Sequence, residues 1–226
     1  MTSARPLIEA SVLLAPGTAE WPGDTPYSCG WTWRIADGAS VNVSSLTMSP
    51  HVGTHADAPV HVRDGTAASD ALPAHAFVGE AAVLDVSDVP ATAAPDGAGA
   101  ITLAALTERA DRQGVRLAGV TRLLLRTGRT IADGRFPAAW PWLDPDAARV
   151  LVGDGLLLLG VDAPSVDARE ARALVTHHAL FDGGACNLES LDLRAAGPGR
   201  FELYAAPLRI AGLDAAPARA LLRRLA

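Results

Sequence analysis

The sequence predicts a mixed α/β fold, in which layers of β-sheet and flanking helices enclose a common core. Strand-like segments dominate the first third of the 226 residues, whereas strand and helix patterns alternate in the remainder. Strands first and strand–helix alternation later are typical of layered folds. A third observation is the run at residues 156–161, which is apolar without alternation and therefore indicates a strand buried on both faces, as in a parallel sheet.

The first third contains three predicted strands, at residues 7–14, 41–48 and 82–86. Along residues 41–48 side-chain types alternate with the two-residue period of a strand. Residues 21–26, Trp-Pro-Gly-Asp-Thr-Pro, are dense in turn-forming types and separate the first two strands.

Two helices have clear start or stop signals. Residues 103–113 show helical spacing of apolar side chains, and Gly114 follows as a C-terminal stop. Asp144 is a good N-cap, and Pro145 suits the first helical position, so a second helix is expected to run from there to Gly153.

Four further elements are predicted from shorter patterns. Residues 122–126 and 201–210 are expected to be strands. A helix is expected over residues 167–174, with Asp167 as its cap. Residues 215–225 predict a terminal helix, whose arginine-rich last turn suits the helix dipole.

Composition narrows the domain organisation and the class of protein. The stretch at residues 89–99, rich in Pro, Ala and Gly, is interpreted as a surface loop, so residues 1–226 are expected to form a single domain. A formal net charge of −6 without a stripe of Lys and Arg argues against a nucleic-acid partner. No apolar run approaches the about 20 residues that cross a bilayer.

The first residues and the two cysteines favour a cytoplasmic protein. The first residues lack the apolar core of a signal peptide. The two cysteines, Cys29 and Cys186, stand in no C-x-x-C motif and are interpreted as reduced thiols.

Three of the six histidines and one aspartate fall within a short window, as His51, His55, Asp57 and His61. The window up to His61 contains no lysine or arginine that would neutralise the acid, so packing alone does not explain it. Imidazole and carboxylate groups are ligands that zinc and manganese take, and catalytic sites leave a position open for water. The window therefore predicts a metal site.

This window must be curled to act as one site. In an extended strand His51 and His55 would lie about 13 Å apart, at roughly 3.3 Å per residue, which is too far to share an ion. Gly53 and Pro59 argue against a regular helix, and Gly53 is where the chain bends most easily. Asp57 then has two oxygens that could bridge a pair of metals.

Three other residues, His177, Glu189 and Trp21, have two open interpretations, whereas His75, Asp162, Ser165 and Asp167 are expected to have structural roles only. His177 and Glu189 are either a helix end with a solvated glutamate or further ligands. Trp21 is either turn packing or a ring that stacks on an aromatic substrate. His75 is expected to be a surface histidine or one satisfied in the core. Turn and cap roles are expected for Asp162, Ser165 and Asp167.

These residues carry a family resemblance. Residues 49–61 resemble the H-x-G-T/A-H-x-D-x-P-x-H signature of the cyclase-type metal-dependent hydrolases, which include the bacterial kynurenine formamidases. The histidine motif is highly specific, and the resemblance covers nearly the full length. Further segments resemble landmarks of the family in the family's order: residues 21–26, 41–43, 123–127, 160–167 and 201–208.

The resemblance implies a fold and a ligand set. The implied fold is the cyclase-like swivelling β/β/α layered fold, with mixed sheets and flanking helices. The matching positions imply that His51, His55 and Asp57 hold a first zinc ion and that Asp57 bridges to a second. His177 and Glu189 match the remaining ligands of that second ion.

The resemblance also implies a reaction. His61 matches the histidine assigned to proton transfer, and Trp21 matches an aromatic residue that packs on the substrate. The implied enzyme is a metal-dependent amidohydrolase that converts N-formyl-L-kynurenine to L-kynurenine and formate in tryptophan degradation. Two divalent ions per subunit are expected, zinc or manganese, in a homodimer. Such ions lower the pKa of bound water toward about 7, so no serine nucleophile is required.

Two alternatives stay open at the level of sequence. Residues 178–189 are glycine-rich where the formamidases carry a more basic stretch, and residues 136–143 look more like general cyclase-type members. The substrate could therefore be a cyclic amide such as isatin. The cluster could also belong to a non-catalytic metal-binding protein.

Overall fold

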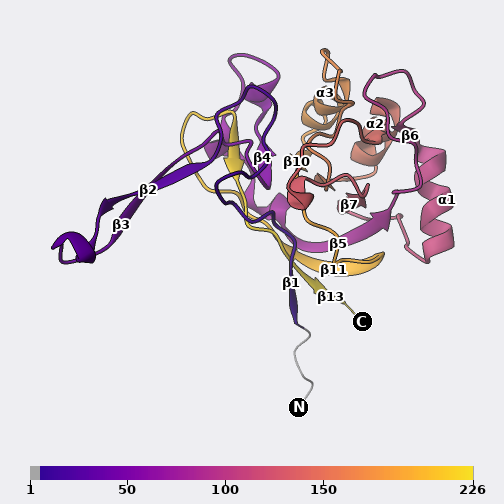
Figure 1. Ribbon diagram of the computed structural model, residues 1–226. Helices are drawn as coiled ribbons and strands as arrows, with labels where there is room; N and C mark the ends of the chain where they lie inside the picture. Colours follow the sequence, from indigo (N-terminus) through magenta and orange to yellow (C-terminus); the bar gives the residue numbers. More distant parts are fainter. Residues whose placement is uncertain (1–5, 226) are drawn as a thin grey trace.

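The computed structural model describes residues 6–225, and within them seven strands form one mixed sheet (Figure 1). In spatial order these are β1 (Leu7–Glu9), β13 (Leu221–Arg224), β11 (Gly199–Tyr204), β5 (Val78–Asp85), β7 (Arg122–Arg126), β9 (Leu158–Val161) and β10 (Cys186–Leu188). The last four run parallel to one another, whereas the first three pair in antiparallel fashion.

Three α-helices of the described chain lie on one face of this sheet (Figure 1). They are α1 (Leu103–Gln113), α2 (Pro145–Gly153) and α3 (Val175–Asp182). The central strand β7 separates two apolar cores, because Leu123 and Leu125 pack with the helices while Leu124 joins the cluster on the opposite face. A strand with a core on each side has apolar residues at consecutive positions.

A small second sheet covers the face opposite the helices. β4 (His55–Asp57) pairs with β12 (Ala215–Pro217) in antiparallel register, and Ala56 packs into the apolar cluster of that face. The layers are therefore small sheet, main sheet and helices. The predicted mixed α/β layered fold is confirmed.

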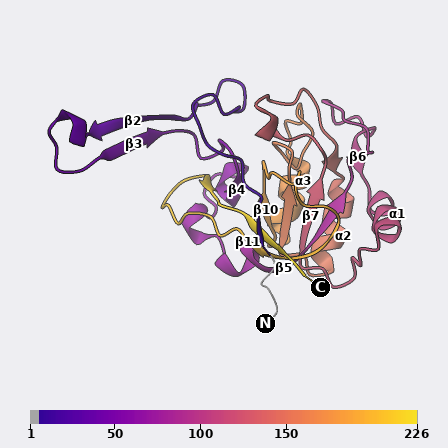
Figure 2. The same cartoon turned by 60° about the horizontal axis from the view of Figure 1, so that its bottom comes forward.

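A long two-stranded arm projects from the body of the molecule (Figures 1 and 2). It consists of β2 (Ser28–Trp33) and β3 (Val43–Thr47), which pair with each other. The remaining short elements are the parallel pair β6 (Ala100–Ile101) and β8 (Trp142–Leu143), and the 3-10 turns η1 (Ile35–Asp37), η2 (Pro59–His61), η3 (Ser69–Ala71), η4 (Ala74–Phe77) and η5 (Ile131–Asp133).

The two helices with local start and stop signals are confirmed. α1 ends at Gly114, which adopts the left-handed conformation with a φ of 65° that favours glycine. α2 begins after Asp144, whose side chain accepts a hydrogen bond from the N–H of Asp146, and Pro145 occupies its first position. The loop at residues 89–99 is also confirmed, because it contains no regular element before β6.

Two helix predictions are wrong. Residues 167–174 form turns, and the helix begins at Val175. Asp167 does cap it, but from a distance, because its carboxylate accepts hydrogen bonds from the N–H groups of Thr176 and His177. Residues 215–225 form β12 and β13 instead of a helix, since they pair with β4 and with β1 and β11.

Several strand boundaries also differ from the prediction. The strand expected over residues 201–210 ends at Tyr204, and the one expected over residues 7–14 ends at Glu9. β5 begins earlier than expected, at Val78. No described helix has the length and apolar character needed to cross a bilayer.

Candidate metal centre

The histidine window folds into a tight loop followed by β4. Gly53 adopts a φ of 76°, and a Cβ at this position would lie 2.5 Å from Leu14 Cδ2. A left-handed residue without a side chain is therefore needed there, as expected from the sequence. The turn brings His51 beside His55, with His51 Nδ1 3.2 Å from His55 Nε2.

Glu189 and His177 reach the same place from distant parts of the chain. Glu189 directly follows β10 and forms an antiparallel bridge with His55, with Glu189 N donating to His55 O at 2.9 Å. His177 lies on α3, and its Nε2 is 3.2 Å from Asp57 Oδ2 and 3.2 Å from Glu189 Oε1. The structure thus brings together all five side chains predicted as ligands.

Hydrogen bonds at the far nitrogen orient two of the imidazole rings. His55 Nδ1 lies 2.9 Å from the Gly53 carbonyl oxygen, which only accepts, so Nδ1 donates and Nε2 is turned toward the site. His51 Nε2 lies 2.9 Å from Asp214 Oδ2, so Nδ1 is the nitrogen turned toward the site. Both of these nitrogens face Asp57 Oδ1, at 3.1 Å for His51 Nδ1 and 3.3 Å for His55 Nε2.

The third ring is oriented in the same way. His177 Nδ1 lies 2.6 Å from Asp167 Oδ2, so its Nε2 is turned toward Asp57 and Glu189. A carboxylate or carbonyl that holds the far nitrogen of each histidine is typical of metal ligands, because it fixes the ring and its tautomer.

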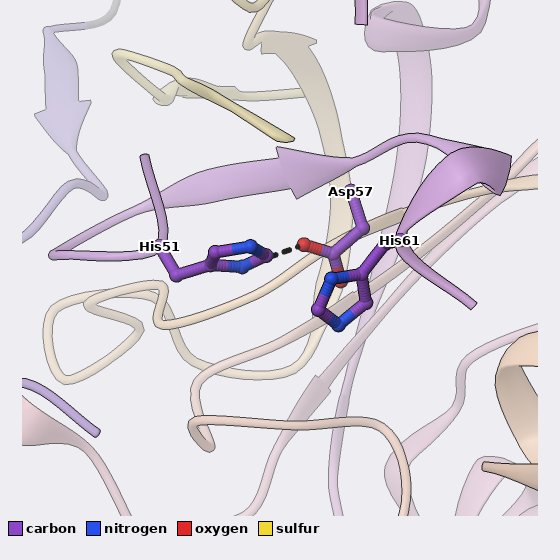
Figure 3. Close-up of side chains that lie close together, drawn as sticks. All are labelled: His51, Asp57 and His61. Atoms are coloured by element: carbon purple, nitrogen blue, oxygen red, sulfur yellow. Dashed lines mark ion pairs between the residues drawn. The ribbon is translucent and has the colours of Figure 1, made fainter. Parts of the chain in front are cut away.

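The donor set fits a divalent cation. Asp57 is 1% exposed and its Oδ1 has no hydrogen-bond partner among the described residues, although His51 Nδ1 and His55 Nε2 face it. Figure 3 shows the ion pair between His51 and Asp57, with the ring of His61 beside it. Ligand atoms of His55, Asp57 and Glu189 all lie within 4.8 Å of one another, and so do those of His51, Asp57 and His61. Buried carboxylate oxygens and imidazole nitrogens that point at one another are suited to a shared metal ion such as zinc or manganese.

A cavity of about 360 Å³ opens above these side chains. Its lining includes Trp21 and Phe136, whose ring centroids are 5.3 Å apart in an edge-to-face arrangement. It also includes His61, whose side chain is 29% exposed and whose Nδ1 lies 3.3 Å from Asp214 Oδ2. Four of the five predicted ligands, all but the buried Asp57, therefore line one cavity with the predicted acid–base histidine and the predicted aromatic contact.

Comparison with known proteins places this site in a family. Residues 8–168 match the family model Cyclase, described as "Putative cyclase". The chain belongs to the cyclase family. A kynurenine formamidase of Salinibacter ruber is 42% identical over 221 residues, which cover 96% of this cyclase-family chain and 97% of that protein.

Solved structures share the cyclase-family fold. One described as a potential metal-dependent hydrolase with cyclase activity has a TM-score of 0.78 at 25% identity, covering 99% of this chain and 100% of that one. Isatin hydrolase A from Labrenzia aggregata has a TM-score of 0.76 at 24% identity, covering 96% and 93%, which is a likeness of fold alone. This cyclase-family protein is therefore a metal-dependent hydrolase, and its site supports a divalent metal.

The charges of the cyclase-family site attract a cation. Burial alone would lower the pKa of His51, but hydrogen bonds and charge interactions with Asp57 and Asp214 outweigh it and raise the pKa to about 9. Burial likewise opposes protonation of His177, yet its carboxylate neighbours raise its pKa well above the ordinary value. Asp57 has its pKa lowered despite complete burial, because the charge of His55 and the hydrogen bonds of its histidine neighbours favour the carboxylate.

Sequence reasoning missed three polar residues of the cyclase-family site. Asp214 contacts both His51 and His61, although it lies far along the chain. Asn187 donates to Asp57 Oδ2 at 2.7 Å and to Glu189 Oε1 at 3.1 Å.

Asp167 was expected to have a cap role, and it also orients His177. The sequence indicated this role of Asp167 indirectly, because a residue that caps a helix can contact a predicted ligand near the start of that helix. No local pattern points to Asp214 or Asn187, because their partners are set by tertiary pairing.

Asp162, Ser165 and His75 have the structural roles expected of them. The Asp162 carboxylate accepts hydrogen bonds from the N–H groups of Thr127 and Gly128 and so holds a turn. Ser165 Oγ accepts from Asp167 N, and His75 is exposed. The two thiols are free, Cys29 at the surface and Cys186 buried.

Proposed function

We propose that this hydrolase converts N-formyl-L-kynurenine to L-kynurenine and formate. The observation that carries the proposal is the convergence of three imidazole nitrogens and two buried carboxylates at the floor of a cavity with aromatic walls. The 42% identity to a kynurenine formamidase over nearly the whole chain supports the same substrate. An open cavity above the ligands favours catalysis over a purely structural metal site.

The proposed ligand set holds two divalent ions, zinc by preference and manganese as an alternative. His51, His55 and Asp57 would hold the first, and Asp57, His177 and Glu189 the second, because Asp57 directs one oxygen toward each group. When bound, such ions supply an activated water and polarise the carbonyl of the substrate. The chain's task is then to fix the ligands, place the substrate and move the proton.

His61 is proposed to move the proton. It takes the proton of the attacking water while the new C–O bond forms, and returns it to the departing amine nitrogen when the C–N bond breaks. Asp214 holds His61 Nδ1, so the ring presents Nε2 as its proton-exchanging atom. The same Asp214 oxygen holds His51, which links the orientation of ligand and base.

The cavity suits an aryl amide that carries an ammonium group. Trp21 is 40% exposed and stands edge-on to both Phe136 and Trp140, so a flat aromatic ring can pack against it. Glu20 and Asp24 contribute to the lining, and none of the described lining residues is Lys or Arg. This charge pattern favours the α-ammonium group of N-formyl-L-kynurenine over the uncharged isatin.

We further propose that the enzyme is a cytoplasmic homodimer. In the reducing cytoplasm the exposed Cys29 would stay a free thiol. The dimer is supported by the arm of residues 28–47, whose Trp31 and Trp33 are 58% and 59% exposed.

Metal analysis combined with turnover of two substrates tests the proposal. Purified protein should contain two equivalents of a divalent metal per chain, lose turnover of N-formyl-L-kynurenine on chelation, and regain it with zinc or manganese. Isatin serves as the competing substrate under the same conditions. Fully loaded protein that opens isatin but does not release formate from N-formyl-L-kynurenine would overturn the assignment.

A further inference from the structure

An arginine lies beside the aromatic wall of the cavity. Arg169 precedes α3 in the chain, and its neighbours Ala168 and Ala171 line the cavity. Its guanidinium carbon lies 5.9 Å from the ring centroid of Phe136, which also lines the cavity. A cation this close to an aromatic ring is attracted by the electron-rich face of the ring. The side chain of Arg169 is therefore held at the edge of the cavity wall.

Only part of this guanidinium group is used within the protein. One terminal nitrogen, Nη1, donates to the Ala138 carbonyl oxygen at 3.1 Å. Among the described residues no carboxylate forms an ion pair with Arg169, and its Nε and Nη2 make no hydrogen bond. A guanidinium carries its N–H donors in a planar fork, and an edge formed by two nitrogens fits the two oxygens of a carboxylate. Arg169 is thus anchored through one nitrogen and keeps a second edge for a ligand.

Negative charge lies close to the same wall. Glu20 and Asp24 line the cavity and flank Trp21 in the chain. Trp21 stands edge-on to Phe136 with ring centroids 5.3 Å apart, so the ring of Phe136 contacts both Trp21 and the guanidinium. A ligand that has a cationic and an anionic group at one end therefore finds a partner for each here. The zwitterion of an α-amino acid is such an end.

The proposed substrate combines these charges with a reactive formamide. In N-formyl-L-kynurenine the formamide and the amino-acid side chain are attached to one aromatic ring, and the side chain ends in an ammonium group and a carboxylate. The formamide has to reach the floor of the cavity, where His51 and His55 lie. With the ring packed on the aromatic wall, the side chain carries the carboxylate away from the ring toward the edge of that wall.

We infer that Arg169 binds the α-carboxylate of the substrate and thereby selects an α-amino acid over a simple aryl formamide. This inference rests on the proposed function, because it names the group that recognises one end of that substrate. Nε and Nη2 of Arg169 donate to the two carboxylate oxygens, while Glu20 and Asp24 face the ammonium group. Arg169 determines specificity and takes no part in bond cleavage, since its contacts are with Phe136 and Ala138.

A purely structural role of Arg169 would have a different signature. Its contacts connect the segment before α3 with the loop that carries Phe136 and Ala138. If Arg169 served only to support that loop, its loss would impair every substrate that packs on the aromatic wall. Loss of a partner for the carboxylate impairs only the substrates that have one.

A pair of substrates isolates the carboxylate. The carboxamide of N-formyl-L-kynurenine keeps the formamide, the ring and the ammonium group but has a neutral amide in place of the carboxylate. Metal-loaded wild-type protein should have a kcat/KM for N-formyl-L-kynurenine about tenfold above that for the carboxamide, which is the effect of one hydrogen-bonded charge pair. Arg169→Met should abolish this preference by raising KM for N-formyl-L-kynurenine, with kcat and the kinetics of the carboxamide unchanged. Arg169→Lys should restore part of the preference, because lysine keeps the charge but lacks the planar fork.

Binding of the product gives a second readout that does not depend on turnover. L-Kynurenine keeps both charges, so calorimetry should show about tenfold weaker binding to Arg169→Met than to the wild-type protein. The matched control is Arg172→Met, which removes the same charge from an exposed position three residues further along the chain. This control should change neither the substrate preference nor the affinity for L-kynurenine.

The outcomes separate this inference from the proposed function. Equal loss of kcat/KM for both formamides in Arg169→Met would indicate a structural role and overturn the inference. A preference that survives Arg169→Met, or that Arg172→Met removes equally well, overturns it too. Wild-type protein that hydrolyses both formamides without preference contradicts the role of Arg169 alone. Metal-loaded wild-type protein that hydrolyses neither contradicts the proposed function, and the inference falls with it.

Discussion

Asp214→Asn is the substitution that best tests how the site is organised. One oxygen, Oδ2, lies 2.9 Å from His51 Nε2 and 3.3 Å from His61 Nδ1, so a single carboxylate orients a ligand and the proposed base. An asparagine keeps the shape but removes the negative charge that both rings share at this oxygen. Metal affinity and turnover should therefore both fall.

The size of the effect follows from the burial of the carboxylate. Loss of a residue that orients a metal ligand costs roughly 10–100-fold in affinity or activity, about 1.4–2.7 kcal/mol. The Asp214 side chain is 46% exposed, so solvent screens its charge and we expect the lower end, about tenfold in each quantity. The assays are metal titration with a competing chelator and kcat/KM for N-formyl-L-kynurenine.

A double-mutant cycle with His61→Gln assigns the effect on turnover. If Asp214 acts through His61, Asp214→Asn should reduce kcat little further once His61 is replaced, while its effect on metal affinity remains. Asp133→Asn is the matched control, since Asp133 is 55% exposed and pairs with Arg194 away from the site. Fully additive effects on kcat, or an Asp214→Asn protein with wild-type metal affinity and turnover, would refute the reasoning.

Four further outcomes are expected. His61→Gln should keep two metals per chain but lower kcat by roughly 10²–10⁴-fold, and loss of metal instead would make His61 a ligand. Glu189→Gln should lose about one equivalent of metal per chain, measured by elemental analysis, and most of its turnover. Two retained ions with full activity would contradict the assignment of Glu189 as a ligand. Trp21→Ala should raise KM about tenfold with little change in kcat, as steady-state kinetics would show, because a stacking contact contributes about 0.5–1.5 kcal/mol. In chelator-treated protein the melting temperature should fall as pH rises from 6.5 through about 9. Burial lowers the pKa of His51, but Asp57 and Asp214 outweigh it and raise the pKa to about 9, so the charged ring stabilises the fold fully only below pH 6.5. An unchanged melting temperature across this range would contradict the prediction.

Local signals explain what could be predicted from the sequence. α1 ends where Gly114 indicates and α2 begins where Asp144 indicates, because a cap acts on neighbouring residues. The start of α3 differs from the predicted start because its cap, Asp167, accepts a hydrogen bond from Thr176, nine residues further along the chain and beyond the turn at Leu174 with its φ of 44°. Residues 215–225 have helix-like apolar spacing, but pairing with β4, β1 and β11 decides their conformation.

The same distinction applies to the site. The window from His51 to His61 is recognisable because its members are close in sequence. Glu189 needed the family resemblance, since a single antiparallel bridge to His55 brings it into place. Asp214 had no local signal at all, because its contacts depend on where β12 pairs with β4.

The root of the arm has a consequence for how such chains can diversify. Both ends of the hairpin meet at the body, where Ser49 N donates to Thr25 O at 3.0 Å, so the arm is a detachable insertion between two fixed points. Insertions whose ends are adjacent can lengthen, shorten or change sequence with little disturbance of the scaffold. Evolution or protein engineering can thus alter the assembly of the molecule while the histidine window, which begins two residues beyond Ser49, keeps its geometry.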